Sequence, residues 1–411
     1  MKNTPRRIIM MVSALALVFV IGCGQDDEAV LTPSFESKLV SAQTVITRPS
    51  GELRGLLGSF ESNLPVEAII HDVTMFKVDY TTMYKGQSIT ASGTAFVPAN
   101  TDPEASFPTM SFQHGTIASN REAPSQLGIG DIQNLLYSGM AGAGFVVVVP
   151  DFIGFGTSVD IVHPYYVEEP TAQAIIDMIR AGGEIALENE ITLTQDLFLS
   201  GYSQGGYATM AAHKYLEESG MEWYELKKSY PSSGGYDVLG VRDYFFSLET
   251  YDQPFFLAFV AEAYRTYYDW DANVLSILFQ EPYASLIPTL FDGSNSGGQV
   301  NDQLTTEISS LVTEEFLANP DAPQFAFVTE AFQANTLLDW TPTVSIALFH
   351  GDADVTVPYQ NSVDSYNSFI STGTSEDVMT FTTLPGATHG SGFFPYLEIV
   401  LNDLVAIQEL D

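Results

Sequence analysis

The sequence has very little cysteine and few basic residues. Its 411 residues include one cysteine, which excludes an intrachain disulfide and a metal site built on several thiolates. Lys and Arg number 15 against 51 Asp and Glu, which gives a formal net charge of −36. A surface of this charge repels phosphate backbones and anionic lipid headgroups. The composition therefore argues against a nucleic-acid partner and against docking on an anionic membrane surface.

The N-terminus lacks an apolar run long enough to span a membrane. After a positively charged start, residues 8–21 are apolar apart from one serine. This run fits the core of a signal peptide and falls short of the roughly 20 residues of a membrane helix. It ends in the letters VIGC, which resemble the lipobox of bacterial lipoproteins. The resemblance implies that residues 1–22 are a lipoprotein signal peptide and that Cys23 carries the lipid. A plain signal peptide with an incidental cysteine is the alternative.

The segment after this cysteine indicates a place in the cell envelope. Gly24 follows it, which argues against retention in the inner membrane, and the acidic letters QDDE at residues 25–28 resemble the surface-export signal of Bacteroidetes lipoproteins. We therefore expect a lipid anchor in the outer membrane after export, with a periplasmic and a surface-facing position both open. Residues 23–50 are expected to form a polar tether. No membrane contact other than the lipid anchor is predicted.

Strand and helix signals alternate along most of the chain, without an internal repeat. Alternating residues predict a β-hairpin over 73–97. Further strands are expected at 109–113, 145–149, 196–200, 344–349 and 378–384, and helices near 130–142, 170–188, 204–218, 360–370 and 395–408. This alternation predicts an α/β fold with a mostly parallel central sheet flanked by helices.

One long stretch departs from this alternation. Residues 241–340 are aromatic and helical without the signal of a buried strand, so we expect a helical cap inserted into a core of residues 51–240 and 341–411. Within the cap, residues 292–303 loosely resemble a calcium loop. They lack acids at the third and fifth positions and have Gln303 where a bidentate glutamate is required. A flexible loop is predicted there.

Ser203 lies in the letters GYSQGG, residues 201–206, between an expected strand and an expected helix. A GxSxG pattern alone is common, and an ordinary serine in a glycine-rich loop is the alternative. In this context the pattern is typical of a nucleophile elbow, whose sharp turn leaves no room for side chains at the flanking positions. The helix N-terminus behind the serine also favours the negative charge that develops in acyl transfer. Ser203 is therefore the candidate nucleophile.

A serine nucleophile needs a histidine base and a carboxylate that orients the base. In the fold that contains such an elbow, the acid follows the serine and the histidine follows the acid. Of the six histidines, only His389 follows a candidate acid. His213 lies on the helix after the elbow, where a surface or packing role is expected. Asp352 and Asp354 both follow a buried strand and are the candidate acids.

The tetrahedral intermediate of acyl transfer needs hydrogen-bond donors for its oxyanion. One candidate is the backbone N–H of Gln204, and the other is the backbone N–H of Gly115 or Thr116. For His114 we prefer a structural role that orients this loop. No cofactor and no metal ion is predicted, since no ligand cluster accompanies the two aspartates.

Four motifs occur in order along the chain: FQHGT (112–116), VPDFIGFGTSVDIVHPY (149–165), GYSQGGYATMAA (201–212) and HGDADVTVP (350–358). Together they resemble the lid-bearing secretory lipases of the α/β-hydrolase superfamily, the fungal lipase A type and their bacterial relatives, over most of residues 75–400. The resemblance implies an α/β-hydrolase fold with a helical cap over the acyl pocket. It also implies a carboxylic ester hydrolase that uses Ser203, Asp354 and His389. The family spacing selects Asp354, with Asp352 as the alternative.

The predicted function is hydrolysis of a small-molecule or lipid ester outside the cytoplasm through an acyl-enzyme. A serine peptidase of the prolyl-peptidase type on the same fold is one alternative, although no propeller-like repeat precedes the catalytic region. A catalytically silent surface lipoprotein that binds a ligand under its cap is another. Against it, the three triad residues and the elbow glycines are all present.

Overall fold

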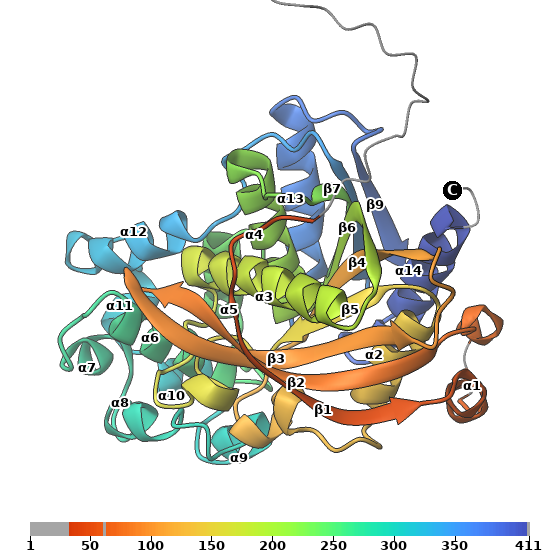
Figure 1. Cartoon of the computed structure of the whole chain (residues 1–411). Helices are drawn as coiled ribbons and strands as arrows, with labels where there is room; N and C mark the ends of the chain where they lie inside the picture. The colour runs from red at the N-terminus through yellow and green to blue at the C-terminus, as the bar shows by residue number, and fades with distance from the viewer. Residues whose placement is uncertain (1–32, 61–62, 409–411) are drawn as a thin grey trace, which may run out of the picture. The chain divides into compact units, whose positions relative to one another are not determined.

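A single mixed sheet organises the chain. The computed structural model describes residues 33–60 and 63–408, and within them nine strands form one sheet in the order β1-β2-β3-β5-β4-β6-β7-β8-β9 (Figure 1). Neighbours from β5 to β9 run parallel, whereas β1, β2, β3 and β5 pair antiparallel in turn. The predicted mostly parallel sheet is confirmed. The strands are β1 (Leu39–Arg48), β2 (Asp72–Tyr84), β3 (Gln87–Ala99), β4 (Ser106–Gln113), β5 (Val146–Pro150), β6 (Thr192–Tyr202), β7 (Glu225–Ser232), β8 (Ser345–Gly351) and β9 (Met379–Leu384).

Helices cover both faces of this sheet. One face packs against α1 (Ser50–Leu57), α2 (Ile132–Gly142) and α14 (Phe393–Gln408). The other packs against α3 (Glu168–Glu188), α4 (Gln204–Ser219) and α13 (Tyr359–Ser371). Val147 and Val149 of β5 join the first core and Val146 and Val148 the second, all at 0% exposure. An unbroken apolar strand is stable here because both of its faces leave water.

The sequence interpretation missed two strands. β1 occupies residues 39–48, so the polar tether expected over 23–50 is wrong in its second half. Among the described strands it pairs with β2 alone, at the sheet edge, and it is mostly exposed, so it needs no buried apolar pattern. β7 lies inside the sheet between β6 and β8, but only its last four residues are buried. Its polar start, with Lys227 and Lys228, hides the strand signal.

The chain between β7 and β8 is helical, as expected for the inserted stretch. Figure 1 shows these helices gathered beside the sheet. They are α5 (Val238–Ser247), α6 (Phe255–Tyr267), α7 (Val274–Leu278), α8 (Tyr283–Leu286), α9 (Gly297–Asn301), α10 (Ile308–Leu311), α11 (Glu314–Ala318) and α12 (Ala326–Ala334). The flexible loop predicted at 292–303 is wrong in part, because α9 forms there. Ser296 and Gln299 cap it reciprocally through their side chains and backbone N–H groups.

The expected signal peptide and Cys23 lie outside the described residues. Among the described residues, no helix is both long enough and apolar enough to cross a membrane.

The turn from β6 into α4 is tight and backbone-strained. Ser203 has φ 62° and ψ −123°, a region that non-glycine residues rarely adopt. A side-chain carbon on Gly205 would lie 1.9 Å from the carbonyl oxygen of Gln113 in β4. One on Gly206 would lie 2.2 Å from that of Ser232 in β7. The two glycines therefore let α4 begin directly against the carboxyl ends of the strands that flank β6.

We expect Gly206→Ala to lower the free energy of unfolding by about 1–3 kcal/mol, because the new methyl group overlaps the Ser232 carbonyl. Gly55→Ala is the matched control. It is also a helical glycine, and no atom lies within 4 Å of the added carbon. Better helix propensity should make the control neutral or more stable by up to about 1 kcal/mol. Chemical denaturation of both variants measures the difference, and equal stabilities would contradict the packing argument.

Candidate active site

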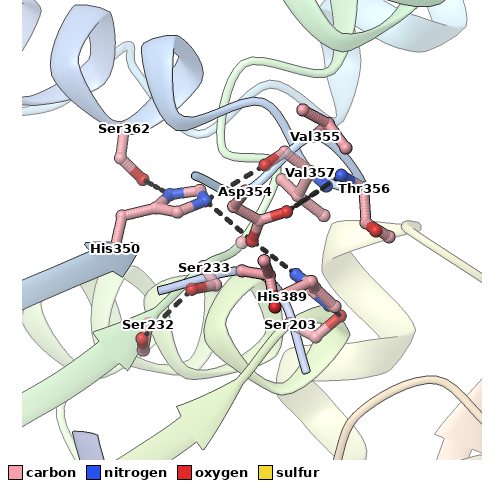
Figure 2. Close-up of polar contacts among 12 residues, drawn as sticks. Ser203, Ser232, Ser233, His350, Asp354, Val355, Thr356, Val357, Ser362 and His389 are labelled. Atoms are coloured by element: carbon pink, nitrogen blue, oxygen red, sulfur yellow. Dashed lines mark hydrogen bonds and ion pairs between the residues drawn. The ribbon is translucent and has the colours of Figure 1, made fainter. Parts of the chain in front are cut away.

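Three side chains from distant parts of the chain meet at the carboxyl edge of the sheet. Ser203 Oγ lies 2.8 Å from His389 Nε2, and His389 Nδ1 lies 2.6 Å from Asp354 Oδ2 (Figure 2). Ser203 sits at the elbow, Asp354 in the loop after β8, and His389 in the loop between β9 and α14. Because a carboxylate only accepts, His389 Nδ1–H donates to Asp354 and Nε2 is left to accept the serine proton.

The carboxylate of Asp354 is buried and fully engaged. Its Oδ1 accepts the backbone N–H groups of Thr356 and Val357 at 2.9 and 3.1 Å. Its Oδ2 faces both His389 and a second histidine, His350, which is 3.2 Å away. Burial acts to raise the pKa of Asp354, but the hydrogen bonds from the two histidines outweigh it and lower the pKa to about 2. The group is therefore ionised at neutral pH.

Asp352, the alternative acid, and His213, a second histidine near the elbow, form hydrogen bonds away from the triad. The carboxylate of Asp352 accepts the backbone N–H of Gly386 at 2.6 Å. Among the described residues it has no other hydrogen-bond partner. His213 is fully buried, with Nδ1 at 2.7 Å from Ser229 Oγ and Nε2 at 2.8 Å from Glu217 Oε1. These geometries favour Asp354 over Asp352 and agree with a packing role for His213.

The backbone of the FQHGT loop lies beside the nucleophile. A carbon added to Gly115 would lie 3.7 Å from Ser203 Cβ. Within the described residues, no acceptor is found for the N–H groups of Gly115, Thr116 or Gln204. His114 has a backbone carbonyl at each ring nitrogen, that of Gly115 and that of Asp151. Burial lowers the pKa of His114, which fits an uncharged structural histidine.

The side chain of Gln204 makes a contact that the sequence interpretation missed. Gln204 Nε2 lies 2.6 Å from His163 Nε2, and His163 Nδ1 lies 2.6 Å from the carbonyl oxygen of Ile153. Burial lowers the pKa of His163 to about 3, so the ring is neutral, donates from Nδ1 and accepts the amide N–H of Gln204. This bond fastens the 149–165 segment to the first turn of α4. A histidine within that motif was the only sequence signal for it.

A pocket extends from Ser203 between the inserted helices. Its walls come mainly from α5 and α6, with one or two residues each from α7, α11 and α12, and Tyr165 and Tyr166 also line it. They are aromatic and aliphatic apart from Ser203, Thr356, Arg242 and the tyrosine hydroxyls. Arg242 is paired with Asp243 and Asp321 at 2.7 and 2.9 Å. The space beside Ser203 therefore suits an uncharged, apolar group.

No group of three or more histidine, cysteine or acidic side chains in the described part of the chain could hold a metal ion.

The segment around the elbow matches a known protein family. Residues 125–218, which include Ser203 but neither Asp354 nor His389, match the family model described as secretory lipase. A search of curated proteins finds no match.

Solved structures share the fold at low sequence identity. A protein of Legionella pneumophila superposes with a TM-score of 0.79 at 24% identity, over 90% of this chain and 97% of that one. The rice cell wall degrading esterase LipA from Xanthomonas oryzae gives 0.77 at 23%, over 90% and 97%. Candida antarctica lipase A in its closed state gives 0.62 at 18%, over 86% and 78%. The family match covers the segment around the elbow, and the solved structures show that the chain shares the fold of these esterases and lipases.

Proposed function

We propose that Ser203, His389 and Asp354 form a catalytic triad that hydrolyses carboxylic esters through an acyl-enzyme. The observation that carries this proposal is the unbroken hydrogen-bonded path from Ser203 Oγ through His389 to Asp354 Oδ2, with distances of 2.8 and 2.6 Å. This is the arrangement that general-base activation of a serine requires.

In the first half-reaction, His389 Nε2 takes the proton of Ser203 as Oγ bonds to the ester carbonyl carbon. The backbone N–H groups of Gln204 and of Gly115 or Thr116 hold the resulting oxyanion. Collapse of the intermediate breaks the ester C–O bond, and His389 returns the proton to the leaving alcohol. Water then attacks the acyl-enzyme by the same route and releases the acid. Asp354, ionised and fixed, stabilises the imidazolium in both halves.

The pocket supports an ester whose acyl group is apolar. Its aromatic and aliphatic lining offers few partners for a polar acid, and its one guanidinium is already paired with two aspartates. Burial of an acyl chain in such a lining is favourable by roughly 0.8 kcal/mol per methylene. The proposed substrates are therefore small-molecule or lipid esters.

The secretory lipase match supports a place outside the cytoplasm. The finer proposal is that Cys23 carries a lipid anchor in the outer membrane. In a bacterial host fed labelled palmitate, the full chain should become labelled and Cys23→Ser should not. Label in the serine variant, or none in the wild type, would contradict the anchor without touching the proposed chemistry.

Ser203→Ala should abolish labelling by a fluorophosphonate probe and lower kcat on p-nitrophenyl butyrate by several orders of magnitude, because the nucleophilic oxygen is gone. Ser138→Ala is the control: Ser138 is buried in α2, and its hydroxyl donates to the Asn134 carbonyl. It should react like the wild type. An unlabelled wild type would refute the triad and favour a silent binding protein.

Ala261→Phe should shorten the acyl chain that the enzyme accepts, because Ala261 of α6 lines the pocket. We expect kcat/KM for p-nitrophenyl palmitate to fall about tenfold or more, and that for the acetate to stay within about twofold. Ile277→Phe, at an exposed position of α7 outside the lining, is the control and should change neither. Equal losses on both esters in Ala261→Phe would place the acyl group elsewhere.

A further inference from the structure

The triad carboxylate has a second histidine on the same oxygen. His350 is the last residue but one of β8 and is 0% exposed. Its Nε2 lies 3.2 Å from Asp354 Oδ2 and 3.1 Å from the carbonyl oxygen of Val357, and its Nδ1 lies 2.7 Å from Ser362 Oγ. Figure 2 shows His350 and His389 approaching Asp354 from opposite sides.

The partners of His350 fix which nitrogen carries the proton. A carboxylate and a carbonyl oxygen can only accept, so Nε2 must be the N–H. In the neutral ring Nδ1 then accepts, and the hydroxyl of Ser362, on α13, donates to it. The result is a continuous array, Ser362–His350–Asp354–His389–Ser203, in which both imidazoles donate to Asp354 Oδ2.

We propose that His350 is a positioning residue of the ester hydrolysis, which holds Asp354 Oδ2 in line with His389 and draws part of the carboxylate charge away from it. This inference rests on the proposed function. Among the described residues, His350 forms no hydrogen bond with the nucleophile or the base, so it acts through Asp354.

Two consequences follow from the shared oxygen. First, four donors surround the carboxylate, two backbone N–H groups on Oδ1 and two imidazoles on Oδ2, so its rotation is fixed. Second, a hydrogen bond from His350 weakens the attraction between Oδ2 and a proton on His389. Removal of His350 should let the carboxylate hold the His389 proton more tightly. Since His389 must be neutral to accept the serine proton, activity should then begin at a higher pH.

Four tyrosines near Asp354 stay uncharged in the range where such an effect is measured. They are Tyr202 of β6, Tyr244 of α5, and Tyr166 and Tyr251 of two loops. Burial raises the pKa of each, that of Tyr202 to about 12. These tyrosines therefore do not contribute to a change in the acidic limb of the activity profile.

The chain provides a matched control in His213. It is also fully buried, with a serine hydroxyl at 2.7 Å from Nδ1 and a carboxylate four residues further on at 2.8 Å from Nε2. Glu217 contacts no triad residue and instead accepts the backbone N–H groups of Thr343 and Val344. Replacing either histidine therefore removes a buried ring with similar hydrogen bonds. Only the replacement of His350 also removes a contact to the triad.

The experiment compares His350→Phe and His350→Gln with His213→Phe and His213→Gln, using p-nitrophenyl butyrate from pH 5 to 9. His350→Phe should lower kcat about 10- to 100-fold, the effect of losing a hydrogen bond to a charged group, with KM little changed. The acidic limb of its kcat/KM–pH profile should move to higher pH. His350→Gln, which keeps an amide donor, should restore most of kcat and of the limb. The His213 variants should keep the wild-type limb.

Thermal unfolding identifies any variant that does not fold. In that case Ser362→Ala, which removes the donor to His350 Nδ1, replaces His350→Phe and should move the limb in the same direction by less. Three results would overturn the inference: an unchanged acidic limb in folded His350→Phe, a shift of that limb to lower pH, or the same shift in His213→Phe. Wild-type turnover would still support the proposed function in each case. Absence of turnover and of fluorophosphonate labelling in the wild type would overturn the proposed function itself.

Discussion

The close contact between the start of α4 and the carboxyl ends of β4 and β7 is the constraint on which the site depends. Gly205 and Gly206 bring the helix nearer to the strand carbonyls than any side chain would permit. That approach holds Ser203 at φ 62°, a conformation that costs a non-glycine residue about 1–3 kcal/mol. Packing of the strands beneath it offsets the strain. The hydroxyl is thereby presented to a histidine 186 residues further along the chain.

Two buried aspartates near this edge illustrate how donors decide the state of a carboxylate. Asp354 accepts hydrogen bonds from two imidazoles and two backbone N–H groups, and these lower its pKa despite burial. Asp151 accepts hydrogen bonds from the Ser92 hydroxyl and the Ser125 backbone N–H, but burial raises its pKa. The first is suited to stabilise a transient positive charge on His389. The second joins three segments of the fold that lie far apart in sequence.

Much of the architecture could be predicted from the sequence, because central strands and their covering helices carry strong apolar patterns. β5 and the helices α3 and α4 were expected within a few residues of their observed bounds. The prediction failed for β1, an exposed edge strand, and for β7, whose first half is polar. In both strands, backbone pairing with neighbours replaces the apolar signal. The candidate triad residues were also named from order and spacing, and the fold brings them within hydrogen-bonding distance.

By itself the sequence determined the alternation of strands and helices, the tight turn around Ser203 and the order of nucleophile, acid and base. These features are local, since they depend on side-chain periodicity, on glycines at fixed positions and on position along the chain. Only the tertiary structure decided that His350 shares the Asp354 oxygen with His389 and that Gln204 binds His163. These contacts depend on how a strand end, the loops beside it and the first turn of α4 meet in space, which no pattern along the sequence encodes.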